Sequence, residues 1–333
     1  HSLKVQPIRY RREGCYYAIF AEDIPPMGYK TFEIVFKQPS TDTGTVTINN
    51  ASIENHFYKL QLNPDKGTIQ SLYDKELNCE LVDSSSPWEL GAFIYEKLGN
   101  RDQLAQYRLD DYNRTGLSEC RIIDSSNGPI YQRILLQGKS PGTDEAFGVN
   151  LEIKLYHDTK RIELEYAIKR LPETEPSGIY VAFPFQLPEG KLAFDVQGGT
   201  VISGKNQLEG TSTDWNTVQN FVSVQNNRAQ IIIGSSLIPL YQLGDINLGK
   251  FQYQKQYERP HVYSWVMNNY WNTNFKASQE GEFRWSYHLT SSVAPSNNLA
   301  TKFGWSSRIP LYTRVMPTGT ENHKPVSYTH LRA

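Results

Sequence analysis

The sequence has few cysteines, almost no net charge and no long apolar run. Its three cysteines, Cys15, Cys79 and Cys120, lack the short spacings of a zinc knuckle or a redox motif, and we interpret them as buried or incidental thiols. Lys and Arg number 34 against 35 Asp and Glu, which gives no positive field for binding a nucleic acid. No apolar run approaches the about 18 residues that cross a bilayer, so we expect neither a nucleic-acid nor a membrane partner.

Motifs for catalysis and metal binding are also missing from the 333 residues. There is no Gly-x-Ser-x-Gly elbow and no phosphate-binding Gly-x4-Gly-Lys-Ser/Thr loop. The seven histidines show no chelating spacing. Paired carboxylates such as Asp110 and Asp111 lie in polar or turn contexts that are typical of a solvated surface. We therefore assign no catalytic residue and no metal ligand to this chain.

What the sequence does contain is a repeated alternation of apolar and polar residues. It has 21 Tyr, 14 Phe and 6 Trp, a composition that suits pleated, half-buried surfaces. Residues 148–156, 160–168 and 281–289 follow a two-residue period, and Gly67 suits the turn of a hairpin that begins near residue 53. Helical periodicity is nearly absent, and the one stretch considered, 100–109, has no convincing apolar face. The pattern predicts an all-β chain of about fifteen to twenty antiparallel strands in a large sandwich.

Changes in composition divide the chain into four parts. We predict a fragment of a small β domain over 1–48, a large β-supersandwich over 49–293 and the start of a further C-terminal β segment over 294–325. Residues 326–333, VSYTHLRA, resemble the translation of a sequencing-library adaptor, and we predict a non-native tail there. Because residue 1 is His, the sequence allows no inference about a signal peptide or a compartment.

Two stretches combine aromatic rings with amides and carboxylates. Rings can stack on the C–H faces of a sugar, and an amide supplies a donor and an acceptor for its hydroxyl groups. One interpretation is that the second stretch, 209–222, lines the same groove as the first, 264–285. The competing interpretation is that the rings belong to the core, that the asparagines cap turns and that 209–222 is an ordinary loop anchored by a buried Trp. The candidate substrate-facing residues are Asn268, Asn269, Trp271, Asn274, Asp214 and Trp215.

Several phrases, read in order, resemble a known family. They include EDIPPMGYKTFEI at 22–34, the hairpin text at 53–83, GTSTDWNTVQNFV at 210–222 and MNNYWNTNFKASQEGEFRWSYHLTS at 267–291. Together they resemble the C-terminal β half of glycoside hydrolase family 38, the α-mannosidases, in a bacterial type of sequence. The resemblance covers roughly residues 5–317. It implies a galactose-mutarotase-like supersandwich flanked by smaller β domains.

The resemblance also implies which parts of the enzyme lie elsewhere. In this family the zinc ion, its His and Asp ligands and the catalytic carboxylates belong to an N-terminal barrel, which no segment here resembles. The implied function is the C-terminal portion of a zinc-dependent retaining α-mannosidase, supporting its own catalytic barrel and part of the pocket for the α-mannoside substrate. We expect zinc in the parent enzyme, none bound by this fragment, and no activity of the fragment alone. The alternatives are a free-standing carbohydrate-binding β-sandwich module without catalysis and a purely structural β protein.

Overall fold

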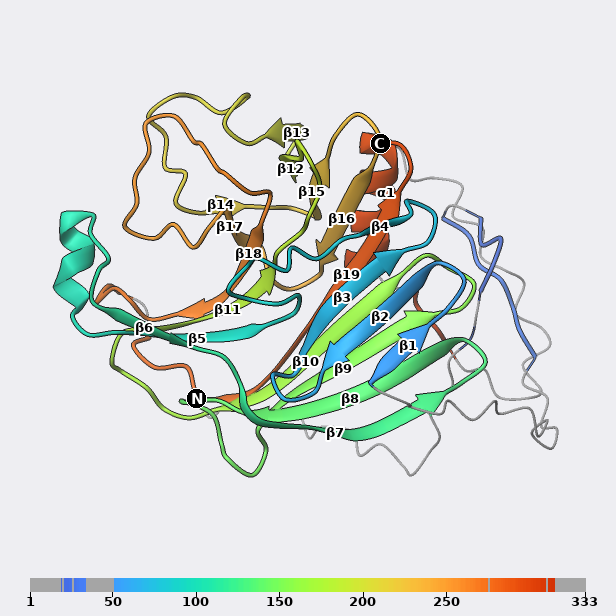
Figure 1. Cartoon of the computed structure of the whole chain (residues 1–333), viewed down its shortest axis with the longest axis horizontal. Coiled ribbons are helices and arrows are strands. Elements are labelled where there is room, and N and C mark those ends of the chain that lie inside the picture. The colour runs from blue at the N-terminus through green and yellow to red at the C-terminus, as the bar shows by residue number, and fades with distance from the viewer. Residues whose placement is uncertain are drawn as a thin grey trace, which may run out of the picture.

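The computed structural model describes residues 19, 21–25, 27–33, 51–274, 276–309 and 311–314. In these residues the chain forms nineteen β-strands, one α-helix and one 3-10 helix, and the strands build three antiparallel sheets (Figure 1). The prediction of an all-β chain based on a large antiparallel supersandwich is confirmed. The tail predicted over 326–333 lies outside the described residues, and the small β domain predicted over 1–48 lies mostly outside them.

The largest sheet has nine strands. At its centre β10 pairs with β19 over nine residues, from Ile162 opposite Leu289 to Arg170 opposite Gly281. Its strands are, in spatial order, β13 (Gly199–Ile202), β12 (Lys191–Val196), β15 (Phe221–Gln225), β16 (Gln230–Ser235), β19 (Gly281–Ser292), β10 (Ile162–Arg170), β9 (Val149–Tyr156), β8 (Tyr131–Lys139) and β7 (Ser118–Asn127).

Two smaller sheets complete the sandwich. The six-stranded sheet has the order β14 (Asn216–Thr217), β17 (Leu240–Leu243), β18 (Val262–Asn268), β11 (Ser177–Phe183), β5 (Phe93–Leu98) and β6 (Tyr112–Thr115). The four-stranded sheet has the order β1 (Ser52–Glu54), β2 (Tyr58–Asn63), β3 (Thr68–Asp74) and β4 (Cys79–Glu80). The predicted hairpin is the β2–β3 pair, and Gly67 in its turn has φ +66°, a conformation that favours glycine.

One hydrophobic core joins all three sheets. Alternate residues of the strands supply it, as the two-residue period predicts, for example Leu164 and Tyr166 on β10, Leu60 on β2 and Val181 on β11. The other face of the nine-stranded sheet carries charge: Lys154 pairs with Glu163 at 3.2 Å and with Glu152 at 3.0 Å. Glu163 thus faces away from the core, as the two-residue period of 160–168 implies, and its ion-pair partners cover most of its side chain.

The β7 edge of the nine-stranded sheet is irregular. Strand β7 pairs only with β8, and the register shifts between Ser118 and Arg121 and again between Ile122 and Asp124. Glu119, inside the first shift, has φ +50°, which a side chain other than glycine rarely adopts. These two bulges bend the strand away from a regular ladder.

A helix replaces part of the β segment predicted over 294–325. Helix α1 (Asn297–Arg308) begins at Ser296, whose hydroxyl accepts a hydrogen bond from the Leu299 N–H at 3.2 Å. Ala300 of α1 packs against Phe221 and Ile232 on the back of the nine-stranded sheet. The β prediction is therefore wrong for 297–308, because burial of this face stabilises a helix that the sequence period does not reveal. The boundaries of the segment stay a prediction.

Candidate functional site

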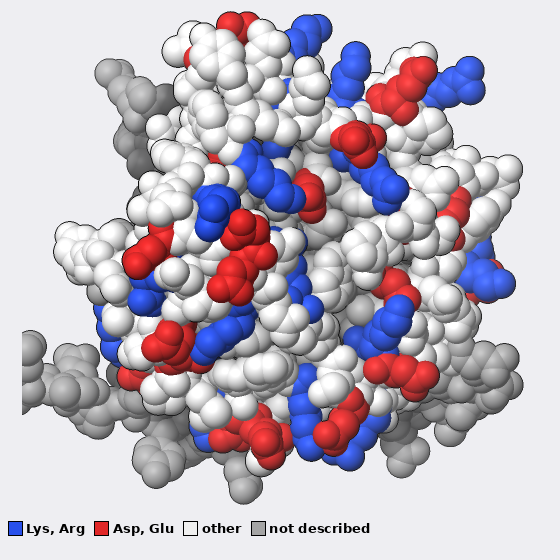
Figure 2. Space-filling view, turned by 60° about the vertical axis from the view of Figure 1, so that its left-hand side comes forward, with Lys and Arg blue, Asp and Glu red and all other residues white. Residues whose placement is uncertain are grey.

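The outer face of the six-stranded sheet carries a second hydrophobic cluster. Strand alternation places Phe93 and Val181 in the main core and their neighbours Ile94 and Tyr180 on this outer face. Three segments cover it: the 3-10 helix η1 (Arg101–Gln106), the loop after β17 and the loop after β18. In Figure 1 these segments lie at the left and upper left of the molecule. On the face turned forward in Figure 2, positive and negative side chains are interspersed.

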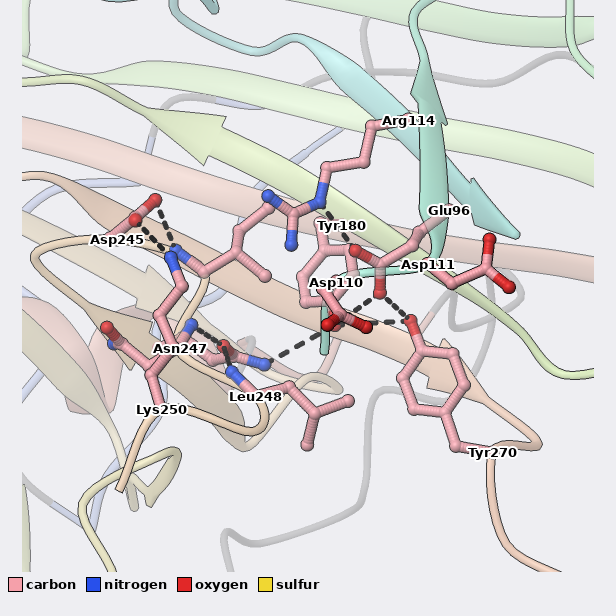
Figure 3. A network of polar contacts seen from close by, with 12 residues as sticks. Glu96, Asp110, Asp111, Arg114, Tyr180, Asp245, Asn247, Leu248, Lys250 and Tyr270 are labelled. Carbon is pink, nitrogen blue, oxygen red and sulfur yellow. Dashed lines mark hydrogen bonds and ion pairs between the residues drawn. The ribbon is translucent and has the colours of Figure 1, made fainter. Parts of the chain in front are cut away.

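A buried ion pair lies within this outer face (Figure 3). Glu96 on β5 is opposite Arg114 on β6 in the strand register, and their side chains form a salt bridge. The Glu96 side chain is 0% exposed and that of Arg114 is 13% exposed. Burial opposes the charge on Arg114, but Glu96 outweighs it and raises the pKa of Arg114. A buried pair of this kind is strongly destabilised if only one partner is removed.

Two buried tyrosines also form hydrogen bonds with the Glu96 carboxylate. Tyr270 donates a hydrogen bond to the carboxylate, and Tyr180 donates a longer one at 3.5 Å. The two phenol oxygens are 3.2 Å apart. Burial is the main cause that raises the pKa of each phenol well above its usual value, and the negative charge of Glu96 adds to the rise in both. Both groups therefore stay neutral hydrogen-bond donors at physiological pH.

The network continues to the loop after β17. Gln242 donates to the Tyr180 hydroxyl at 3.4 Å, and its side-chain oxygen accepts hydrogen bonds from the backbone N–H groups of Asn247 and Leu248 (Figure 3). Gln242 is completely buried. Its amide therefore fixes the loop 244–250 over the sheet and places Ile246 and Leu248 in the outer cluster.

An aromatic cluster stands beside the ion pair and unites the two aromatic stretches. The Trp215 ring centroid is 5.5 Å from that of Trp265 and 5.9 Å from that of Trp271. Trp271 in turn lies 5.9 Å from Tyr270 and 6.1 Å from Trp265. Trp265 and Tyr270 are buried, whereas Trp271 is 40% exposed. Trp271 is thus the ring of this group that is open to a ligand, and its substrate-facing role stays a prediction.

The asparagine candidates differ in how free their amides are. The Asn269 side chain accepts from the Ser177 N–H at 2.8 Å and donates to the carbonyls of Glu173 and Ala277 at 2.9 and 3.1 Å. These hydrogen bonds hold the loop after β18 in place. They agree with the competing interpretation, in which the asparagines cap turns. Asn268, which ends β18, and Asn274 are exposed.

Asp214 is buried next to the exposed end of the aromatic cluster. It is 3% exposed, and its Oδ1 has no hydrogen-bond partner among the described residues. Burial raises the pKa of its carboxyl, and the charge of Lys255 partly opposes that rise. The carboxyl of Asp214 is thus covered by the protein in this structure, and its substrate-facing role stays a prediction.

Sequence reasoning missed Glu96, Arg114 and Tyr180. The one available signal was Glu96, a charged residue on the same strand face as Ile94 and Leu98. The pairing of Glu96 with Arg114 depends on the register of β5 and β6, which the sequence pattern does not contain.

The zinc ion that the family resemblance implies does not fit the residues described here. No group of three or more His, Cys, Asp or Glu side chains in this part of the chain is arranged to hold a metal ion. Cys79 and Cys120 are half-buried free thiols, and burial raises the pKa of both. In the part of the chain that the structure describes, neither helix is long and apolar enough to cross a membrane.

Comparison with known proteins identifies the family. The three antiparallel sheets around one core define the class of protein, which is an all-β supersandwich domain. Residues 53–252 match the model of the glycosyl hydrolases family 38 C-terminal domain. The chain belongs to this family and contains its C-terminal domain. No curated protein matches the chain.

Two solved structures of glycoside hydrolase family 38 share the fold. An α-mannosidase from Enterococcus faecalis V583 aligns with a TM-score of 0.56 and 14% identity, covering 78% of this chain and 31% of that one. A glycosyl hydrolase family 38 protein from Enterococcus faecalis aligns with a TM-score of 0.55 and 14% identity, covering 78% and 32%. A putative aldose 1-epimerase from Escherichia coli K12 aligns with a TM-score of 0.43 and 8% identity, covering 73% and 98%. The chain thus spans about a third of the length of the two Enterococcus structures.

Proposed function

We propose that the chain is the C-terminal portion of a zinc-dependent retaining α-mannosidase. In this proposal its β domains brace the enzyme's own catalytic barrel and form part of the pocket for the α-mannoside. The observation that carries the proposal is the family match over 53–252, together with an alignment that spans 31% of an α-mannosidase. The catalytic carboxylates and the zinc ligands then belong to the part of the parent enzyme outside this chain, and the fragment binds no zinc.

Exposed aromatic and apolar side chains support a bracing role. Tyr107 at the end of η1 is 70% exposed, and its ring lies 6.3 Å from that of Phe251, which is also exposed. Tyr253 and Leu208 are exposed on adjoining loops, which are joined by a hydrogen bond from the Gly210 N–H to the Tyr253 carbonyl. Exposed apolar groups that lie together are typical of an interaction surface. This surface suits contact with the catalytic domain.

The enzymatic test compares the chain with its parent. We expect the 333-residue chain, supplied with zinc and an aryl α-mannoside, to show no turnover, and the complete enzyme to hydrolyse the same substrate. Zinc content measured after dialysis should be negligible for the chain and stoichiometric for the parent. Turnover by the chain comparable to that of the parent would contradict the proposal that the catalytic residues lie outside this chain.

The aromatic cluster favours one further candidate, a free-standing carbohydrate-binding module. Trp271 is an exposed ring supported by Trp215 and Trp265, which is the rigid platform that a sugar face needs. Titration of the chain with mannose oligosaccharides discriminates between the two. A free-standing module should give saturable heat that disappears in Trp271→Ala, whereas a part of a larger pocket should show little affinity alone.

A further inference from the structure

A cleft that the proposed function does not use lies between the nine-stranded sheet and the loop 255–257. Its volume is about 410 Å³, and three of its lining residues are lysines: Lys191 on β12, Lys205 after β13 and Lys255. No Asp or Glu lines it; the other lining residues are Ile202, Ser203, Gly204, Gln256 and Tyr257. Through Lys191 and Tyr257 it continues into a second cleft of about 500 Å³, whose lining carries both signs of charge.

The three lysines lack the partners that other lysines of the chain have. Within the described residues none of the three forms an ion pair. Nine other lysines do so: Lys66, Lys75, Lys97, Lys139, Lys154, Lys160, Lys169, Lys250 and Lys276. Three unpaired ammonium groups around one cleft leave a local excess of positive charge on a chain whose net charge is −1. Such an excess favours an anion.

One lining group is buried without a partner, and a second is largely buried. Ser203 is 5% exposed, and its hydroxyl has no hydrogen-bond partner among the residues described. Lys255 is 7% exposed, and burial lowers the pKa of its ammonium group to about 8 although Asp214 and Asp245 act in the opposite direction. Neither carboxylate forms an ion pair with it. A buried hydroxyl is costly when it is unsatisfied, and burial disfavours the charge on Lys255, so a ligand that supplies negatively charged acceptors would stabilise both groups.

We propose that this cleft, lined by Lys191, Ser203, Lys205 and Lys255, is a binding site for a phosphate group. A phosphate monoester carries a charge of about −1.5 to −2 at neutral pH and three acceptor oxygens. That charge and acceptor set match several ammonium groups and one hydroxyl. The lining contains no Arg, and lysines bind phosphate as point charges. The site does not depend on the proposed mannosidase function.

Calorimetric titration of the full chain with inorganic phosphate tests the site at low ionic strength. We expect saturable binding that weakens as NaCl is added. Lys205→Gln, which removes an exposed charge from the lining, should weaken binding about tenfold, the value of one charge-assisted hydrogen bond. Lys59→Gln is the matched control, because Lys59 on β2 is also exposed and unpaired but lies outside the cleft. Lys255→Met and Ser203→Ala extend the test to the buried groups, with folding checked by circular dichroism.

The source of the phosphate is resolved by two further titrations. Mannose 6-phosphate binding more tightly than inorganic phosphate, with no heat from mannose, would assign the site to a phosphorylated sugar. Equal affinities would assign it to free phosphate. The proposal is overturned if the unmodified chain gives no saturable heat with either phosphate, or if Lys205→Gln and Lys59→Gln bind phosphate equally well.

Discussion

The rings of Trp215 and Trp271 lie 5.9 Å apart between centroids, although one precedes β14 and the other follows β18. Their contact joins the two loops over the outer face of the six-stranded sheet. Buried Trp265 supports both rings from below, at 5.5 and 6.1 Å. The partly exposed Trp271 is therefore held by packing rather than free to turn.

Replacement of Trp271 by alanine tests whether this ring contacts a sugar. In the complete enzyme we expect Trp271→Ala to raise KM for an α-mannoside by about tenfold, since a lost ring contact costs ~1 kcal/mol or more. The variant should also lose some stability, because Trp271 packs on Trp215 and Trp265, so KM is compared at a temperature where both variants are folded. Trp305→Ala is the control, because Trp305 on α1 is similarly exposed, at 47%. Equal KM values for the two variants would exclude the sugar contact.

Removing the charge of Glu96 should destabilise the sandwich. Glu96→Gln leaves the Arg114 guanidinium buried without its counter-charge, and we expect a loss of about 3–5 kcal/mol in the free energy of unfolding. Urea denaturation followed by fluorescence measures it. Glu280→Gln, in an exposed pair with Lys276, should cost less than about 1 kcal/mol. The double variant Glu96→Gln/Arg114→Met should recover part of the loss, and a failure of Glu96→Gln to destabilise would contradict the role given to the pair.

Gly178 should tolerate no side chain. A Cβ at this position of β11 would lie 2.0 Å from the Tyr270 hydroxyl oxygen and 2.6 Å from Tyr270 Cζ. Tyr270 is fully buried, so it cannot move aside cheaply. We expect Gly178→Ala to cost about 1–3 kcal/mol, as overpacked sites do, and to change tryptophan fluorescence by displacing Tyr270 from Trp265. Gly199→Ala, where nothing lies within 4 Å of the added Cβ, should be close to neutral.

Acid should destabilise the chain through His288. Burial first, and then the charge of Arg161, lower the pKa of His288 to about 4 in the folded state from 6.5. The unfolded chain therefore binds more protons between these values, so stability is complete above pH 6.5 and falls as the pH drops toward 4, by on the order of 3 kcal/mol.

Urea midpoints measured between pH 7 and pH 5 check this dependence. In His288→Asn the slope should flatten, because the titrating group is gone. His56→Gln, which changes an exposed histidine, should keep the slope of the unmodified chain. An unchanged slope in His288→Asn would show that another group is responsible.

The strands were the part of the fold that the sequence could predict. In β9, β10 and β19 successive residues point to opposite faces of the sheet. On β10 the predicted core residues Ile162, Leu164 and Tyr166 are indeed buried. Helix α1 could not be predicted, because its buried positions are Ala300, Gly304 and Ser307 rather than large apolar residues. Small residues are required there: a Cβ on Gly304 would meet the Asn220 carbonyl oxygen at 2.9 Å.

The site was predictable only where its residues are close in sequence. The composition of the stretch 264–285 was enough to select Trp271 as a candidate. The same composition could not show that the amide of Asn269 is already hydrogen-bonded. Its partners are backbone groups of Glu173, Ser177 and Ala277. The Glu96–Arg114 pair likewise depends on strand register. Sequence composition therefore indicates the kind of surface, while tertiary contacts decide which of its polar groups are free.

The two bulges of β7 make this edge of the nine-stranded sheet a poor template for strand addition. An edge strand with regular, unpaired N–H and C=O groups would offer a template on which another copy could add a strand and so begin an aggregate. Here Glu119, Arg121 and Asp124 lie at the irregular positions, and charge and curvature together prevent a neighbour from docking in register. Strand addition by another copy is therefore less favourable at β7 than it would be at a straight edge.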